Sequence, residues 1–336
     1  MASPPRVVVI FTGGTISMLP DPATGAAVPS LDGAGVLARV RGLDEIATLE
    51  PIDWGVVPAS HLRFGQILEV GAKIADAAAR PQVDGVVVVQ GTDVLEETAF
   101  AWDLLHRAEA PVVVVGAMRN AGDPDYDGPR NLTDAVRVAA DPRLRGAGAL
   151  VVMAGLILPA DNVTKTDSIA LDTFQALDDG PLGYVEDGRV VLERDRGPRH
   201  VLPNRPSEAG APVALLTAVV STDGDLVRAA IDLGAAGIVI EATGSGNTDP
   251  DLLTAATEAM AADIPVVLVS RCASGPVGPW YGFPGGGRSW QEAGAILAGT
   301  LSGPKARMAL ALGIGAGLDR DGLGELLGEG LGGDDA

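Results

Sequence analysis

The chain has 336 residues, a formal net charge of −20 and a hydrophobic content of 47% with few aromatic residues. This length allows two packed domains, and the composition is typical of an α/β protein that is rich in small aliphatic side chains. An acidic surface of this size repels phosphate backbones and anionic membranes, so we expect neither a nucleic-acid partner nor a membrane partner.

The cysteine and histidine residues exclude two further classes of protein. Cys272 is the only cysteine, so no intrachain disulfide can form and the composition suits a reducing cytoplasm. His61, His106 and His200 lack metal-ligand spacing, and we therefore expect no metal. The first predicted strand begins near Arg6, which leaves no room for a secretory signal, and no apolar run is long and clean enough to span a bilayer. These features predict a cytoplasmic enzyme.

The first informative stretch is residues 7–17, which read Val-Val-Val-Ile-Phe-Thr-Gly-Gly-Thr-Ile-Ser. The β-branched run predicts a strand that is buried on both faces, and the two glycines let the backbone turn sharply at its carboxyl end. Thr12 and Thr15 would then present hydroxyls at the edge of a parallel sheet, where ligands bind in open α/β folds. An ordinary glycine-rich turn with solvated threonines is the competing interpretation of this stretch alone.

The next elements follow in order along the chain. Residues 18–30 are punctuated by Pro, Gly and Asp without helical or strand periodicity, which predicts a long loop beside the sheet edge. A helix near residues 34–41 and a short strand near 46–54 come next, followed by a helix over 64–80.

A second threonine motif follows the buried strand predicted at residues 86–89. It reads Gln-Gly-Thr-Asp and ends at Asp93, immediately before a helix marked by Glu96. Thr92 would thus stand at a second strand end, next to a carboxylate. Spacing alone favours a structural interpretation, in which Asp93 and Glu96 form a capping box.

Further strands at residues 112–115 and 149–153 alternate with a helix at 131–140, and the second of these strands leads through an apolar turn to Lys165. This alternation predicts a doubly wound, mainly parallel sheet, whose right-handed crossovers bring the strand ends to one side. We expect an N-terminal catalytic α/β domain over residues 1–192.

A charged and proline-rich segment at residues 193–212 is predicted to be a linker, and a smaller C-terminal α/β domain is expected over 213–336. Within this second domain the patterns predict strands at 213–220, 237–241 and 265–270 and helices at 226–234 and 251–262. Helical segments are expected from 289 to about 313, with a short one near Leu323, and an acidic tail follows.

The motifs together resemble the bacterial-type L-asparaginase family. The resemblance rests on Thr-Gly-Gly-Thr-Ile at residues 12–16, Gln-Gly-Thr-Asp at 90–93, Val-Gly-Ala-Met-Arg at 115–119, Val-Thr-Lys-Thr at 163–166 and Gly-Pro-Leu-Gly-Tyr at 180–184. Their order and spacing match across nearly the whole chain. The resemblance implies a two-domain subunit that hydrolyses a side-chain amide without a cofactor and assembles as a homodimer or homotetramer with sites near the subunit interfaces.

The family pattern assigns a role to particular residues. Thr15 matches the nucleophile, Thr92 the second catalytic threonine, Asp93 the acid that also holds the substrate's amino group, and Lys165 the lysine of the same cluster. The resemblance thus implies that Thr15 attacks the amide carbon, ammonia leaves and water hydrolyses the acyl-enzyme.

Further residues are expected around the substrate. Ser60 matches a ligand of the substrate carboxylate, and Asn247 stands where the family contributes a residue from the neighbouring subunit. His61, Gly14 and Gly91 are also expected to line the substrate, the two glycines because backbone N–H groups of these turns would hold the carbonyl oxygen.

Three departures from the family pattern concern groups around the nucleophile and substrate. Residues 16–31 contain no tyrosine where family members commonly carry one in the lid; Tyr281 would replace that phenol only by reaching a neighbour's site, and packing is the favoured interpretation of Tyr281. Ser60-His61 replaces the common Ser-Gln, and Gly-Gly-Gly-Arg at residues 285–288 lacks the glutamate that many family members supply across the subunit interface.

Two rival functions remain open at this point. An amidase of the same fold would act on a different amide, such as a D-amino acid, a peptide or an imide. A non-catalytic protein that binds a small acid would retain the scaffold without turnover. The subunit of a tRNA-dependent amidotransferase is disfavoured, because such subunits usually carry an extra N-terminal domain and because the surface is acidic.

Overall fold

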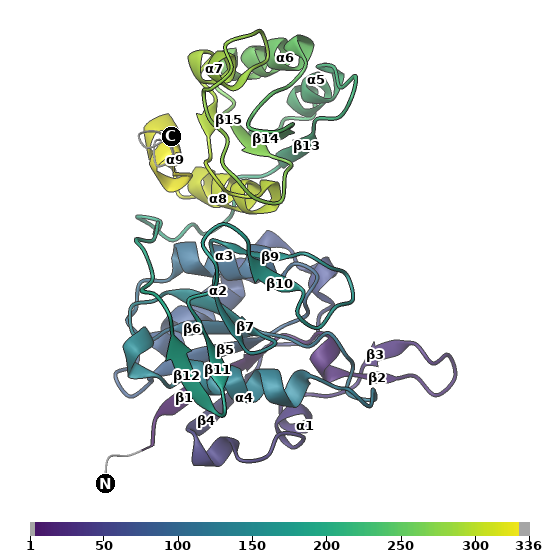
Figure 1. Cartoon of the computed structure of the whole chain (residues 1–336), viewed down its shortest axis with the longest axis vertical. Coiled ribbons are helices and arrows are strands. Elements are labelled where there is room, and N and C mark those ends of the chain that lie inside the picture. The colour runs from purple at the N-terminus through teal and green to yellow at the C-terminus, as the bar shows by residue number, and fades with distance from the viewer. Residues whose placement is uncertain (1–3, 329–336) are drawn as a thin grey trace. The chain divides into compact units, whose positions relative to one another are not determined.

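The computed structural model describes residues 4–328, and the chain separates into two compact units that divide between Arg199 and His200 (Figure 1). This division lies inside the segment at 193–212 that the sequence marks as a linker. The acidic C-terminal tail lies outside the described residues. None of the described helices is long and apolar enough to cross a membrane.

An eight-stranded sheet forms the centre of the first unit. Its strand order is β12-β11-β8-β7-β6-β5-β1-β4, and the five strands from β7 to β4 run parallel. The parallel strands are β1 (Arg6–Phe11), β4 (Thr48–Asp53), β5 (Gly85–Val89), β6 (Val112–Val115) and β7 (Ala149–Met153). The antiparallel strands are β8 (Leu156–Pro159), β11 (Gly183–Glu186) and β12 (Arg189–Leu192).

The valine-rich strands β5 and β6 are buried at every residue, as expected of parallel strands that are covered on both faces. Figure 1 shows α2 and α3 on one face of the sheet and α4 on the other. The helices of this unit are α1 (Gly33–Leu37), α2 (Phe64–Ala78), α3 (Leu95–Leu105) and α4 (Gly128–Ala139), with short 3-10 turns η1 (Thr15–Ser17), η2 (Leu43–Glu45), η3 (Ala59–His61) and η4 (Pro142–Leu144). The predicted class of fold is confirmed, but one crossover differs from the expected right-handed form. The strands advance in one direction from β5 through β6 to β7, whereas α3 and α4 cover opposite faces of the sheet, so one of these two crossovers is left-handed.

Two segments of the first unit differ from the sequence prediction. The expected loop at residues 18–30 contains a small hairpin, in which β2 (Met18–Pro20) pairs with β3 (Ala27–Pro29). The Asp21 carboxylate accepts hydrogen bonds from the backbone of Ala23 and Thr24 and so closes the turn of this hairpin. The apolar turn expected after residue 153 leads instead into β8, because glycine and a left-handed residue at Ala154 reverse the chain within two residues.

The second unit contains a four-stranded parallel sheet in the order β13-β14-β15-β16. Its strands are β13 (Val213–Thr217), β14 (Gly237–Ala242), β15 (Val266–Ser270) and β16 (Ile296–Leu297), and its helices are α5 (Asp225–Asp232), α6 (Pro250–Ala261), α7 (Gly287–Glu292), α8 (Gly303–Gly315) and α9 (Arg320–Leu326). α7 and α8 correspond to the helical segments expected from 289 to about 313, and β16, which was not expected, lies between them. Gly294, with a φ of 98°, ends α7 and lets the chain return to the sheet as β16.

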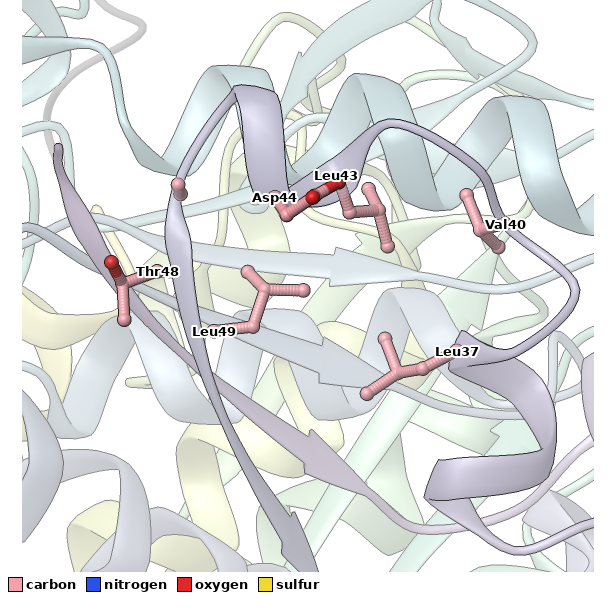
Figure 2. Close-up of a pocket in the computed structure, with 7 residues that line it drawn as sticks. Leu37, Val40, Leu43, Asp44, Thr48 and Leu49 are labelled. Atoms are coloured by element: carbon pink, nitrogen blue, oxygen red, sulfur yellow. The ribbon is translucent and has the colours of Figure 1, made fainter.

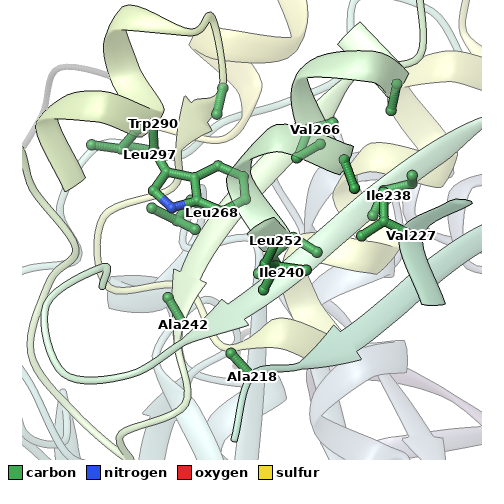
Figure 3. Close-up of a cluster of buried hydrophobic side chains, with 14 of the residues drawn as sticks. Ala218, Val227, Ile238, Ile240, Ala242, Leu252, Val266, Leu268, Trp290 and Leu297 are labelled. Atoms are coloured by element: carbon green, nitrogen blue, oxygen red, sulfur yellow. The ribbon is translucent and has the colours of Figure 1, made fainter. Parts of the chain in front are cut away.

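One side of this smaller sheet packs on a core of aliphatic residues around an indole (Figure 3). Ile238, Ile240 and Leu268 of the sheet are fully buried, and Trp290 of α7 is buried beside them. The Trp290 Nε1 donates a hydrogen bond of 3.0 Å to Thr248 Oγ1, so the polar atom of the indole is satisfied inside the core.

A buried ion-pair cluster holds the end of the first unit. Asp103, near the end of α3, accepts hydrogen bonds from Arg196 at 2.8 Å, from Arg199 at 2.7 Å and from the backbone N–H of Ala149 at 2.7 Å. Burial raises the pKa of the Asp103 carboxyl, and the two guanidinium groups oppose that rise. The charged residues 196 and 199 therefore fasten the chain to α3 before it enters the second unit.

We expect Asp103→Asn to lower the free energy of unfolding by about 3–5 kcal/mol, because the buried Arg199 guanidinium loses its carboxylate partner and Arg196 loses one of its two. Urea unfolding followed by circular dichroism measures the loss. Asp125→Asn is the matched control, since Asp125 pairs with Arg119 through a side chain that is 60% exposed, and removing such a pair costs less than about 1 kcal/mol. Equal effects of the two substitutions would contradict the structural role of the Asp103 cluster.

Candidate active site

The two threonine motifs meet at the carboxyl ends of the neighbouring parallel strands β1 and β5. A methyl group at Gly14 would lie 2.3 Å from the backbone nitrogen of Gly91 and 2.4 Å from its Cα, so the two turns are in direct backbone contact. Gly14 also has a φ of 99°, which an L side chain rarely adopts. Thr15 and Thr92 each follow one of these two glycines, so the contact brings both threonine turns together.

A third turn joins this contact. A methyl group at Gly91 would lie 2.9 Å from the side chain of Ala59, which begins η3. Ser60 and His61 follow directly and are exposed. The structure thus places these two expected substrate-binding residues beside the turn that carries Thr92.

Thr92, Lys165 and Asp93 form a polar cluster. The Lys165 Nζ donates a hydrogen bond of 3.0 Å to Thr92 Oγ1 and lies 3.6 Å from Asp93 Oδ1. Thr92 is buried, whereas the Lys165 side chain is 17% exposed and the Asp93 side chain 64%. The lysine side chain is thus largely shielded, while the Asp93 carboxylate beside it is open to a ligand.

Glu96 fixes the strand that carries the lysine. Its Oε2 accepts a hydrogen bond of 2.9 Å from the backbone N–H of Lys165, which ends β9 (Val163–Lys165) opposite β10 (Phe174–Ala176). The capping-box interpretation of Asp93 and Glu96 is therefore wrong. The N-cap of α3 is Val94, which has no side-chain cap, and both carboxylates face Lys165 instead.

The other polar residues of the two motifs support the backbone. The Thr12 hydroxyl donates to the Val89 carbonyl at 3.0 Å, and the Gln90 side chain donates to Thr98 Oγ1 at 2.7 Å. Both side chains are buried. Thr15, by contrast, is only half-buried at the start of η1, which leaves it as the threonine of its motif that a ligand can approach.

Asn131 and Asp127 support the wall behind Thr92, and the sequence prediction missed them. The Asn131 Nδ2 donates to the Gly116 carbonyl at 3.1 Å and to Asp127 Oδ2 at 2.9 Å. A methyl group at Gly116 would lie 3.0 Å from the Thr92 methyl, so the glycine packs against the threonine. The sequence signal for Asn131 is a polar residue in the first turns of an amphipathic helix, which a surface position would explain equally well.

Asn247 belongs to the second unit, in the turn after β14. Its backbone is paired with Thr243 in both directions, at 2.9 and 3.0 Å. The Asn247 Oδ1 is buried without a hydrogen-bond partner among the described residues. Its expected contribution to a neighbouring subunit's site remains a prediction.

The structure also contains a pocket of about 420 Å³ (Figure 2). Leu37, Leu43 and Leu49 line it, with Asp44 and Thr48 among its polar groups. Thr48 and Leu49 begin β4 and pair with the start of β1, so this pocket lies at the amino ends of the strands, whereas the threonine turns lie at the carboxyl ends. Within the described part of the chain no group of three or more metal-ligating side chains is placed to hold an ion.

Comparison with known protein families gives two matches along the chain. The model of the family described as "Asparaginase, N-terminal" matches residues 6–197, and that described as "Glutaminase/Asparaginase C-terminal domain" matches residues 212–327. The chain belongs to the asparaginase family. The resemblance inferred from the motifs is confirmed, and the protein is a hydrolase that acts on amides.

Individual asparaginase relatives align over most of the chain. A protein of Deinococcus radiodurans named probable L-asparaginase is 36% identical over 98% of this chain and 99% of its own length. The L-asparaginase of Bacillus licheniformis is 31% identical over 91% of this chain and 94% of its own length, and L-asparaginase 2 of Escherichia coli is 30% identical over 92% and 89%.

We expect Gly14→Ala to abolish measurable amide hydrolysis, because the added methyl would enter the backbone of Gly91 and separate the two threonine turns. Gly25→Ala is the matched control, since Gly25 also has a positive φ, of 71°, but has no atom within 4 Å of the added methyl. The control carries only backbone strain of about 1–2 kcal/mol. Ammonia release and circular dichroism of both variants check this, and a fully active Gly14→Ala protein would contradict the contact.

Proposed function

We propose that this asparaginase-family enzyme hydrolyses L-asparagine to L-aspartate and ammonia through a threonine acyl-enzyme. The observation that carries the proposal is the largely shielded side chain of Lys165, whose Nζ lies 3.0 Å from Thr92 Oγ1. The turn that carries Thr92 is also in backbone contact with the turn that carries Thr15. The relatives with the names L-asparaginase and L-asparaginase 2 support this choice of substrate.

In the proposed first step, the Thr15 hydroxyl attacks the side-chain amide carbon. A threonine hydroxyl is a weak nucleophile until a neighbouring group takes its proton. Thr92 and Lys165 form the polar relay that receives this proton in our scheme and passes it to the leaving nitrogen, which departs as ammonia. The Asp93 carboxylate, 3.6 Å from Lys165 Nζ, orients the lysine nitrogen in this scheme.

In the second step, water attacks the acyl-enzyme and the same relay takes its proton. The Thr15 oxygen then leaves the acyl carbon and regains a proton, which restores the enzyme and releases the acid product. Backbone N–H groups of the turns at Gly14 or Thr92 would stabilise the oxyanion in both steps, a contribution of about 3 kcal/mol per donor in comparable sites.

We assign substrate recognition to the exposed groups around this cluster. The open Asp93 carboxylate would hold the substrate's amino group and Ser60 its carboxylate. Asn247 would enter the site from a neighbouring subunit, which makes a homodimer or homotetramer the proposed active form. We retain the cytoplasmic location as a prediction from the sequence; a relative from Haemophilus influenzae is named probable L-asparaginase periplasmic, with 32% identity over 92% of this chain.

One observation favours a different amide as the substrate. His61 is exposed beside the turn of Thr92, at a position where an imidazole replaces a neutral side-chain amide in the family pattern. An imidazole presents a different arrangement of hydrogen-bond donors and acceptors from that of a side-chain amide. A D-amino acid amide, a peptide amide or a cyclic imide is therefore the second candidate.

A panel of amides assayed for ammonia release, with ring opening followed for the imide, separates these candidates. We expect L-asparagine to be the preferred substrate, and we expect Thr15→Ala to lower kcat/KM by at least about 10³-fold because the nucleophile is removed. Thr254→Ala, on the exposed face of α6, is the control and should keep full activity. If the wild-type enzyme prefers another amide, the second candidate is the substrate class. If it releases ammonia from none of the amides and opens no imide ring, the protein is not an amide hydrolase of the proposed kind.

Trapping with an electrophilic amide analogue tests the identity of the nucleophile. We expect intact-mass analysis and peptide mapping to place one adduct on Thr15, because Thr92 is buried and already hydrogen-bonded to Lys165. Thr92→Val should still form an adduct, more slowly, whereas Thr15→Val should form none. An adduct confined to Thr92 would overturn the assignment.

A further inference from the structure

The loop that follows β6 lies along the chain segment that starts at Thr15. Tyr126 Oη donates a hydrogen bond of 2.7 Å to the carbonyl of Ile16, and the backbone N–H of Ala121 donates one of 2.9 Å to the carbonyl of Met18. A methyl group at Gly122 would lie 2.5 Å from the ring of Pro20, so the loop also packs against the end of β2. The loop thus contacts alternate residues just after the proposed nucleophile.

The loop itself is held firmly from behind. The Asp127 carboxylate accepts backbone hydrogen bonds from Met118 at 3.0 and 3.1 Å and from Arg119 at 2.9 Å, and it also binds Asn131 of α4. Asn131 also binds the Gly116 carbonyl behind Thr92, so the hydrogen bonds of Asp127 and Asn131 support the wall behind that threonine. Tyr126 directly precedes Asp127 in the chain and reaches the turn of Thr15.

The phenol ring has little freedom to leave this position. A methyl group at Gly128 would lie 2.4 Å from the ring of Tyr126, so the ring packs directly on the first residue of α4. Burial raises the pKa of Tyr126 to about 12, which keeps the hydroxyl protonated and therefore a donor at neutral pH. The same shift makes this phenol unsuited to act as a base.

Thr15 consequently lies between two fixed neighbours. Gly14 on one side is held against Gly91, and Ile16 on the other side is held by Tyr126. We propose that Tyr126 is a positioning residue for Thr15, and that its hydrogen bond to the Ile16 carbonyl fixes the turn from which the Thr15 hydroxyl attacks. This inference rests on the proposed role of Thr15 as nucleophile, and it assigns a function to a tyrosine outside the hairpin of residues 18–29, which contains no tyrosine.

Tyr126→Phe tests the proposal, because it removes the hydroxyl and keeps the ring. We expect kcat to fall about tenfold while KM changes less than twofold, since substrate-binding groups are untouched and only the alignment of the nucleophile is lost. The rate of adduct formation on Thr15 should fall by the same factor. Hydrogen exchange at the amides of Ser17 and Met18, which close the η1 turn, should become about tenfold faster, with the Thr12 amide unchanged.

The other two tyrosines of the chain provide controls. Tyr184→Phe, half-buried on β11, and Tyr281→Phe, exposed in the second unit, should leave kcat and the exchange at Ser17 unchanged. Should Tyr126→Phe fail to fold, Gly128→Ala keeps the hydroxyl and displaces the ring, and the same losses are expected.

Each outcome decides the proposal. Unchanged kcat or unchanged exchange at Ser17 and Met18 in Tyr126→Phe overturns it, and a larger loss of kcat in Tyr281→Phe transfers the role to the second unit. If the wild-type enzyme hydrolyses no amide, the proposed function fails, and the positioning role of Tyr126 in catalysis fails with it. Faster hydrogen exchange at Ser17 and Met18 in Tyr126→Phe would still show that Tyr126 holds the turn. If the enzyme is active but Tyr126→Phe matches it, only the positioning role is lost.

Discussion

The site depends on one steric constraint, the backbone contact between Gly14 and Gly91. Adjacent parallel strands bring the two turns to the same edge of the sheet, but only residues without a Cβ allow their main chains to approach this closely. The contact sets the separation of the Thr15 and Thr92 turns before any side-chain interaction is made. The side-chain groups of the two threonines, Lys165 and Asp93 therefore project from a backbone of fixed geometry.

Lys165 reaches the turn of Thr92 from a different part of the fold. It comes from a short hairpin outside the parallel strands, and Glu96 at the start of α3 holds its backbone. The helix that follows the Thr92 motif therefore also orients the lysine that binds Thr92. This arrangement explains why two carboxylates, Asp93 and Glu96, lie three residues apart without capping the helix.

The sequence was sufficient to predict the parallel sheet, since runs such as residues 86–89 are apolar at every position, and it was sufficient to recognise the family from motifs at strand ends. It also predicted that Thr92, Asp93 and Lys165 would come together. Local patterns failed where a distant partner decides the structure. Asp93 and Glu96 have capping-box spacing, but both carboxylates contact Lys165, which is distant in the sequence, instead of capping the helix. The hydrogen bond from Tyr126 to the Ile16 carbonyl joins residues 110 positions apart, and no sequence motif marks it.

Short elements were missed for a related reason. β8 and β16 are strands of only four and two residues. They form because a neighbouring strand offers hydrogen-bond partners, and a local sequence pattern does not indicate such a partner. The hairpin at residues 18–29 is likewise closed by the Asp21 turn rather than by an alternating pattern.

Helix α3 carries Glu96 at its beginning and Asp103 near its end, and the latter clamps Arg196 and Arg199. These two arginines therefore hold the chain to α3 before it enters the second unit. Glu96 and Lys165 both belong to the first unit, so a sequence change confined to the second unit leaves intact the hydrogen bond that orients the lysine backbone.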